Sequence, residues 1–113
     1  MSRAAEYFST IPLVTCSLLA VNVAVHIAIF LSSVSLNKFM INAHLVLDEG
    51  EYFRIVSSAF VHGGIMHILM NMSSLIQLGP SLELQFGSLK FLILTLWSVI
   101  LIGGLYCLLS WLV

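Results

Sequence analysis

The chain has 113 residues, of which 60% are hydrophobic and only nine are Asp, Glu, Lys or Arg. Soluble domains usually have about a quarter of their residues charged, so the composition excludes an ordinary soluble globule, and it equally excludes a disordered chain. The net charge of −1 gives no basic field, and nucleic acid is therefore not an expected partner. We expect an all-α, multi-pass integral membrane protein in contact with the lipid bilayer, with room for three spans of about 20 residues each.

The first predicted span covers residues 11–31, a largely apolar run that reaches roughly 31 Å as a helix. Thr10, followed by Ile11 and Pro12, is typical of a helix start. A cleaved signal peptide is the competing interpretation, but this run is longer than the roughly 7–15 residues of a signal core and has no small-x-small cleavage site, which favours a retained span. Residues 32–54 form a polar first loop with interspersed apolar residues, typical of an amphipathic element at the membrane interface.

The second predicted span, residues 55–78, is rich in polar side chains that a lipid-facing helix would not tolerate, so most of them should face protein or a wet cavity. Gly79-Pro80 predicts the end of this helix. Residues 91–113 supply the third span, where Gly103 and Gly104 offer a place for close helix contact. The whole chain, 1–113, is interpreted as one membrane domain. Its Lys and Arg residues are divided evenly between the two sides, so the positive-inside rule leaves its orientation open.

A narrow polar stripe marks the second span. At 100° per residue, Gly63, His67, Asn71 and Ser74 fall within about 80° of one another on a helix. His67 and Asn71 both have N–H groups that donate to a negatively charged oxygen, and such donors make up an oxyanion hole in acyl-transfer enzymes. The alternative is that this pair only hydrogen-bonds a neighbouring helix.

A metal site is a further alternative for this span, because His62 and His67 both have imidazole rings. A separation of five residues puts them roughly 140° apart on a helix, and Asn is a poor zinc ligand, so neither a metal nor a cofactor is expected. Cys16 and Cys107 lie in separate apolar runs without a CxxC motif, and they are predicted to be structural rather than disulfide-bonded or redox-active.

About 40 residues of the chain resemble the second helix and following loop of rhomboid intramembrane serine proteases. The similarity lies in an arginine eight residues before a histidine, an H-x4-H-x3-N pattern, and a later E-x3-G turn: Arg54, His62, His67, Asn71, Glu83 and Gly87. This resemblance implies that His67 and Asn71 line an oxyanion hole and that His62 supports the site. It also implies that Arg54 and Glu83 brace the first loop and its junctions. The expected fold is the N-terminal half of the six-helix rhomboid fold.

The resemblance also shows what the sequence lacks. Rhomboid proteases cleave transmembrane substrates with a serine in a G-x-S-G motif on the fourth helix and a histidine on the sixth. This sequence has no G-x-S-G motif, and no histidine follows His67. Because a serine hydroxyl is a weak nucleophile without a paired base, we expect this chain alone to be inactive. Two hypotheses remain: the N-terminal part of a rhomboid protease, or a non-catalytic rhomboid-like protein that binds transmembrane partners.

Overall fold

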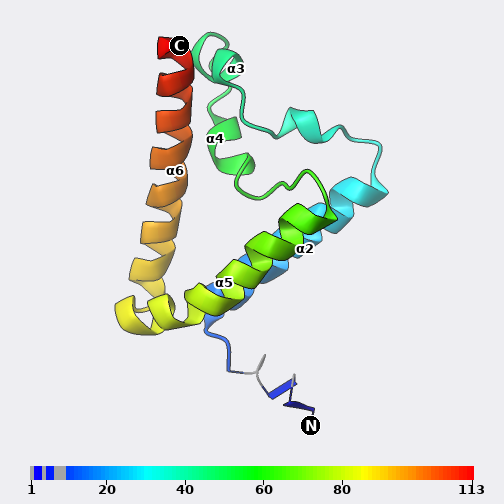
Figure 1. Ribbon diagram of the computed structural model, residues 1–113, viewed down its shortest axis with the longest axis vertical. Coiled ribbons are helices and arrows are strands. Elements are labelled where there is room, and N and C mark those ends of the chain that lie inside the picture. Colours follow the sequence, from blue (N-terminus) through cyan, green and yellow to red (C-terminus); the bar gives the residue numbers. More distant parts are fainter. Residues whose placement is uncertain (1, 4, 7–9) are drawn as a thin grey trace.

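The computed structural model describes residues 2–3, 5–6 and 10–113, and its long elements are three helices (Figure 1). They are α2 (Leu13–Leu31), α5 (Ile65–Phe86) and α6 (Ser88–Leu112). Between α2 and α5 lie three short elements: η1 (Leu36–Lys38), α3 (Ala43–Leu47) and α4 (Phe53–Ser57). No strand occurs within the described ranges, which agrees with the predicted all-α class.

Helices α2 and α5 pack side by side and run in opposite directions, while α6 leaves the end of α5 at an angle and gives the molecule a V shape (Figure 1). The α2–α5 contact is close at Gly79, which is buried against Thr15. A Cβ atom added at Gly79 would lie 2.8 Å from Thr15 Cγ2 and 2.9 Å from Thr15 Oγ1. Glycine at this position therefore sets how closely the two helices approach.

Helix α2 begins at Leu13 rather than at the predicted start after Thr10, with Pro12 as its N-cap in an extended conformation. The first turn of any helix leaves backbone N–H groups without intrahelical partners. Here the carboxylate of Glu83 accepts two of them, from Val14 at 2.8 Å and from Thr15 at 2.7 Å. A side chain 68 residues away along the chain thus caps this helix, which is why a local pattern placed the start too early.

The prediction that Gly79-Pro80 ends the second helix is wrong, because α5 continues through Pro80 to Phe86. A proline inside a helix removes one backbone hydrogen bond and costs about 3 kcal/mol. Contacts on both sides of Pro80 hold the helix together: Gly79 packs on Thr15, and Glu83 binds the start of α2. The helix ends instead at Gly87, whose φ of 84° is open to glycine but unfavourable for other residues.

Helix α6 begins at Ser88, three residues before the predicted start of the third span, directly after the Gly87 break. Gly103 is buried, and a Cβ atom there would lie 2.8 Å from Ile55 Cγ2 of α4, so the expected close contact occurs at this glycine. Gly104 faces open space. Cys16 is an exposed free thiol and Cys107 is a buried one.

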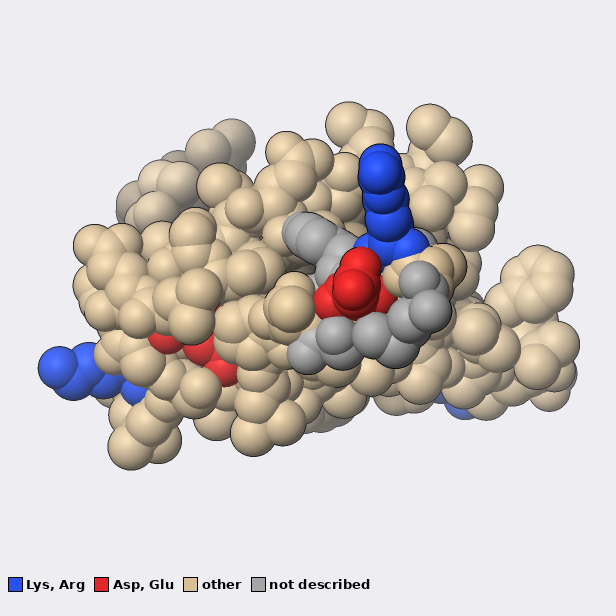
Figure 2. Space-filling view, turned by 90° about the horizontal axis from the view of Figure 1, so that it is seen from below, with Lys and Arg blue, Asp and Glu red and all other residues tan. Residues whose placement is uncertain are grey.

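The first loop packs against α6 through α3 and α4, and its most buried residue is Val46, which is 1% exposed. Two helices, Leu13–Leu31 and Ser88–Leu112, are long and apolar enough to cross a membrane, whereas the more polar α5 does not meet that criterion. Most of the face seen in Figure 2 is uncharged, and a few Lys, Arg, Asp and Glu side chains interrupt it. Large hydrophobic residues of α6, such as Leu101, Ile102 and Trp111, are exposed. This surface suits contact with lipid or with further helices.

We expect Gly79→Ala to weaken the α2–α5 contact by about 1–3 kcal/mol, because overpacking a close helix contact forces the backbones apart. Unfolding of purified protein in mixed detergent micelles, followed by far-UV circular dichroism as the SDS fraction rises, measures this loss. Gly104→Ala is the matched control, since it adds the same methyl group to a helix with no heavy atom within 4 Å. Equal stability of the two variants would contradict the close-contact role of Gly79.

Candidate functional site

The start of α5 divides the predicted polar stripe into two parts. Because α5 begins at Ile65, with Gly64 as its N-cap, His62 and Gly63 lie in the connection before the helix rather than on it. His67, Asn71 and Ser74 are on the helix, at spacings of four and three residues, and all three are exposed. The structure therefore keeps the two candidate oxyanion donors on one open face of α5 and removes Gly63 from that face.

The polar groups on this face are partly satisfied within the helix. The Asn71 amide nitrogen donates to the His67 carbonyl at 2.8 Å, and the Ser74 hydroxyl donates to the Met70 carbonyl at 3.1 Å. An amide NH₂ has two hydrogens, so Asn71 retains one for another acceptor. The His67 ring and this remaining N–H are two donors that the exposed face of α5 offers to a ligand.

His62 packs directly against His67, contrary to the predicted separation of about 140°. Their ring centroids are 5.1 Å apart and the ring planes are inclined at 76°, an edge-to-face arrangement. His62 is 7% exposed and lies outside the long helices. Burial lowers the pKa of His62 below its usual value, and electrostatic interaction with the neighbouring His67 and His26 lowers it further. A neutral imidazole thus backs the ring of His67.

These imidazoles do not form a metal centre. Within the described ranges, no group of three or more His, Cys, Asp or Glu side chains is arranged to hold a metal ion. His44 lies elsewhere, on α3, where its Nδ1 pairs with Asp48 at 2.6 Å.

Arg54 ties the first loop together from α4. Its side chain is buried and donates to the carbonyls of Asn37 at 2.8 Å and Met40 at 2.9 Å, on either side of the end of η1. The Arg54 guanidinium also pairs with Glu51. A guanidinium group has five donors in a rigid fork, which suits this task of holding two carbonyls and a carboxylate at once.

Glu83 joins three segments at the opposite end of α5. Besides the two α2 backbone groups, its carboxylate accepts hydrogen bonds from the Thr15 hydroxyl at 2.8 Å and from the Ser88 hydroxyl at 2.7 Å. The residue is 2% exposed. Four hydrogen bonds to one buried carboxylate connect the start of α2, the end of α5 and the start of α6, and Gly87 provides the turn between the last two.

Comparison with known proteins places these residues in a family. The model of the Rhomboid domain matches residues 49–113, which is more than half of the chain and includes the α5 face and Glu83. This chain belongs to the rhomboid family. The family match, together with two long apolar helices, indicates an integral membrane protein.

Several curated rhomboid-like proteins of Arabidopsis thaliana are similar to the chain. Rhomboid-like protein 14, mitochondrial, is 35% identical over 96 residues, which cover 80% of this chain and 29% of that protein. RHOMBOID-like protein 5 is 40% identical over 45 residues, covering 40% of this chain and 15% of that protein. Inactive RHOMBOID-like protein 8 is 37% identical over 62 residues, covering 55% of this chain and 17% of that protein. The chain thus spans less than a third of the length of these relatives. No solved structure matches it.

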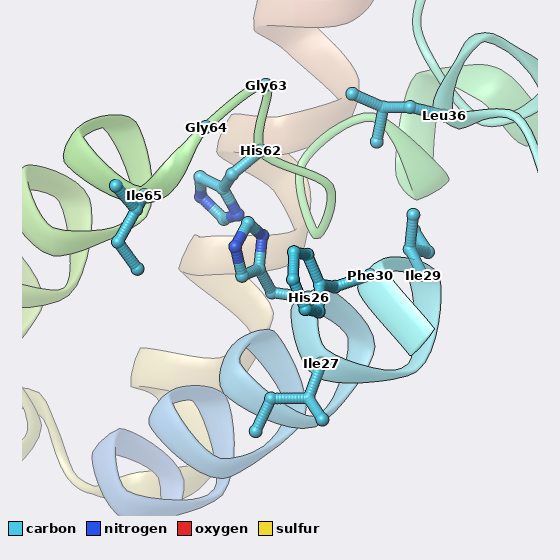
Figure 3. A pocket seen from close by; sticks show the side chains of 9 residues that line it. All are labelled: His26, Ile27, Ile29, Phe30, Leu36, His62, Gly63, Gly64 and Ile65. Carbon is cyan, nitrogen blue, oxygen red and sulfur yellow. The ribbon is translucent and has the colours of Figure 1, made fainter. Parts of the chain in front are cut away.

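A pocket of about 670 Å³ adjoins the histidines of this rhomboid chain, between the end of α2, η1 and the start of α5 (Figure 3). Its walls are largely apolar, with Ile27, Phe30 and Ile65 among them, and His26 and His62 are its two imidazoles. The rings of these two histidines face one another in Figure 3. The sequence patterns did not identify His26 as a site residue, because a single histidine in an apolar run has no characteristic spacing.

The sequence patterns also missed the hydrogen-bond partners of the bracing residues. Glu51, Thr15 and Ser88 contact Arg54 or Glu83. Glu51 was noticeable only as an acidic residue three positions before an arginine. Thr15 gave no signal at all, because its partner is distant in the sequence.

Proposed function

We propose that this chain supplies the oxyanion-side part of a rhomboid-type intramembrane serine endopeptidase, whose substrates are transmembrane proteins. The observation that carries the proposal is the exposed pair His67 and Asn71, which lie one helical turn apart on α5 with His62 packed behind His67. The Rhomboid domain match covers all three residues. Because His67 and Asn71 lie on one open face of α5, both can donate hydrogen bonds to an anionic oxygen that approaches from outside the group of α2, α5 and α6.

In this proposal, the His67 ring and the free N–H of Asn71 donate to the oxygen of the scissile carbonyl as it becomes negatively charged. Donors that are already in place stabilise this charge strongly where water is excluded. The nucleophilic serine and its base would come from segments with the G-x-S-G motif and a later histidine, which this sequence does not contain. The role of this chain is therefore to stabilise the oxyanion and to position the substrate carbonyl.

We further propose that α5 crosses the membrane between α2 and α6, so that the protein is multi-pass. Its polar side chains, His67, Asn71 and Ser74, would then face other helices or a wet cavity, because such groups are expensive in contact with lipid. Arg54 at the first loop and Glu83 with Gly87 at the α5–α6 turn would brace the two ends of this span. Their hydrogen bonds to neighbouring segments support that assignment.

A non-catalytic rhomboid-like protein that binds transmembrane partners is the second candidate. It is favoured by the similarity to Inactive RHOMBOID-like protein 8. The exposed face of α5 also favours it, since polar side chains of this kind form hydrogen bonds between transmembrane helices when a partner helix covers them. Crosslinking from single cysteines placed at Met70 and Ser74 tests it. In this case we expect crosslinks to a specific membrane protein in native membranes, and their absence would remove the support for partner binding.

Serine-directed phosphonate probes test the proposal that this chain supplies the oxyanion donors but not the nucleophilic serine and its base. We expect no labelling of residues 1–113 in membranes, because a serine hydroxyl without a paired base reacts poorly. Fusion to the serine- and histidine-bearing helices of a rhomboid protease should produce labelling at the serine of the G-x-S-G motif. In-gel fluorescence after probe treatment reads out both results. Labelling of the unfused chain that disappears when one particular serine is replaced would contradict the proposal.

A further inference from the structure

A group of polar side chains on α2 is left unexplained by the oxyanion site. Asn22 and His26 are four residues apart, so they lie on the same face of α2. Asn22 is 6% exposed, and His26 lines the pocket opposite His62 (Figure 3). Asn22 is buried, and a buried polar side chain needs hydrogen-bond partners.

Two buried atoms in this region lack such partners. Among the described residues, the buried side-chain nitrogen and oxygen atoms without a hydrogen-bond partner are Asn22 Oδ1 and His62 Nδ1. The Asn22 amide nitrogen already donates to the Leu18 carbonyl at 2.7 Å, which leaves Oδ1 as a free acceptor. Leaving both atoms unpaired in a buried site is unfavourable.

His26 is a candidate partner for both atoms. It follows Asn22 by one helical turn, and its ring faces that of His62 across the pocket. A neutral imidazole has one N–H donor and one nitrogen acceptor. His26 can therefore accept a hydrogen bond from His62 with one ring nitrogen and donate with the other to Asn22, without any group becoming charged.

We propose that His26 is a positioning residue: it accepts a hydrogen bond from Nδ1–H of His62 and donates its other N–H to Oδ1 of Asn22. The resulting row of side chains, Asn22–His26–His62, anchors the His62 ring to α2. His67 packs edge to face against that ring. The row fixes the tautomer of His62 and thereby the orientation of His67. Its importance for oxyanion stabilisation rests on the function proposed above, whereas the hydrogen bonds themselves do not.

Nitrogen-15 NMR of the imidazole rings tests the row directly, using the full chain labelled at histidine in detergent micelles. In the wild type we expect His62 as a single Nδ1–H tautomer, with a through-hydrogen-bond coupling to a ring nitrogen of His26. His26→Phe keeps an aromatic ring but removes both nitrogens, so His62 should shift to a mixture or to the Nε2–H tautomer, and the His67 resonances should move. His26→Gln, which retains a donor and an acceptor, should restore the wild-type tautomer.

The control is His44→Phe, because His44 lies on α3 and pairs with Asp48 outside the row, and it should leave the His62 signals unchanged. An unchanged His62 tautomer in His26→Phe would overturn the proposal. If that variant does not fold, the wild-type spectrum still decides, since an Nε2–H tautomer of His62 or the absence of coupling to His26 refutes the row. These signals do not depend on peptide cleavage, so a failure of the row and a failure of the proposed function are distinguishable.

Discussion

Replacement of Glu83 by Gln is expected to destabilise the folded protein by about 2–6 kcal/mol. The wild-type carboxylate accepts four hydrogen bonds, including two from backbone groups at the start of α2. A glutamine amide offers one oxygen and turns its NH₂ group toward other donors, so at least two buried donors lose their acceptor. Each donor left unpaired costs roughly 1–3 kcal/mol.

The loss is measurable as a shift in the unfolding transition in mixed micelles, with far-UV circular dichroism as the signal. The matched control is Glu49→Gln, which removes the same charge from an exposed residue and should change the stability by no more than about 0.5 kcal/mol. Glu83→Gln should also start to unfold at the α2–α5–α6 junction, seen as faster amide exchange at Val14 and Thr15. Wild-type stability in Glu83→Gln would show that the carboxylate does not hold this junction.

Loss of one of the two proposed oxyanion donors should have a comparably large effect on catalysis. In an active fusion of this chain to the serine- and histidine-bearing helices of a rhomboid protease, we expect Asn71→Ala to reduce kcat by about 10²–10³-fold. KM should change little, because the donor acts on charge that develops in the transition state. His67→Ala should behave similarly, and the double variant should lose less than the product of the two effects, since both donors serve one oxygen.

Steady-state cleavage of a fluorogenic transmembrane substrate in proteoliposomes measures these constants. Ser74→Ala is the control, because Ser74 lies on the same exposed face one turn further along and donates to the Met70 carbonyl. It should retain wild-type kcat within a factor of about two. A rise in KM at unchanged kcat for Asn71→Ala would indicate that Asn71 binds the ground state of the substrate and is not an oxyanion donor.

The candidate site was predictable from the sequence where its chemistry has a fixed spacing. His67 and Asn71 are four residues apart, and any helix through them presents both on one face, so their shared position followed from periodicity alone. The same reasoning failed for His62, because periodicity says nothing about where a helix begins. With α5 starting at Ile65, the peptide before it turns and brings the two imidazoles together.

The helix ends were mispredicted where distant contacts override local signals. Pro80 is a strong local stop signal, yet α5 passes through it because Gly79 and Glu83 on either side are bound to α2. The same carboxylate caps α2 in place of a nearby N-cap side chain. His26 had no local signal at all, since only the folded chain places its ring opposite His62.

Cleavage by the fusion protein tests most directly whether this chain supplies an oxyanion half-site of the rhomboid type, as proposed. We predict that the fusion cleaves a transmembrane substrate and that it takes up a serine-directed phosphonate. Replacing His67 and Asn71 together by alanine should lower kcat by at least about 10²-fold while the helical fold is retained. Wild-type turnover in that double variant, with its unfolding transition unchanged, would contradict the claim.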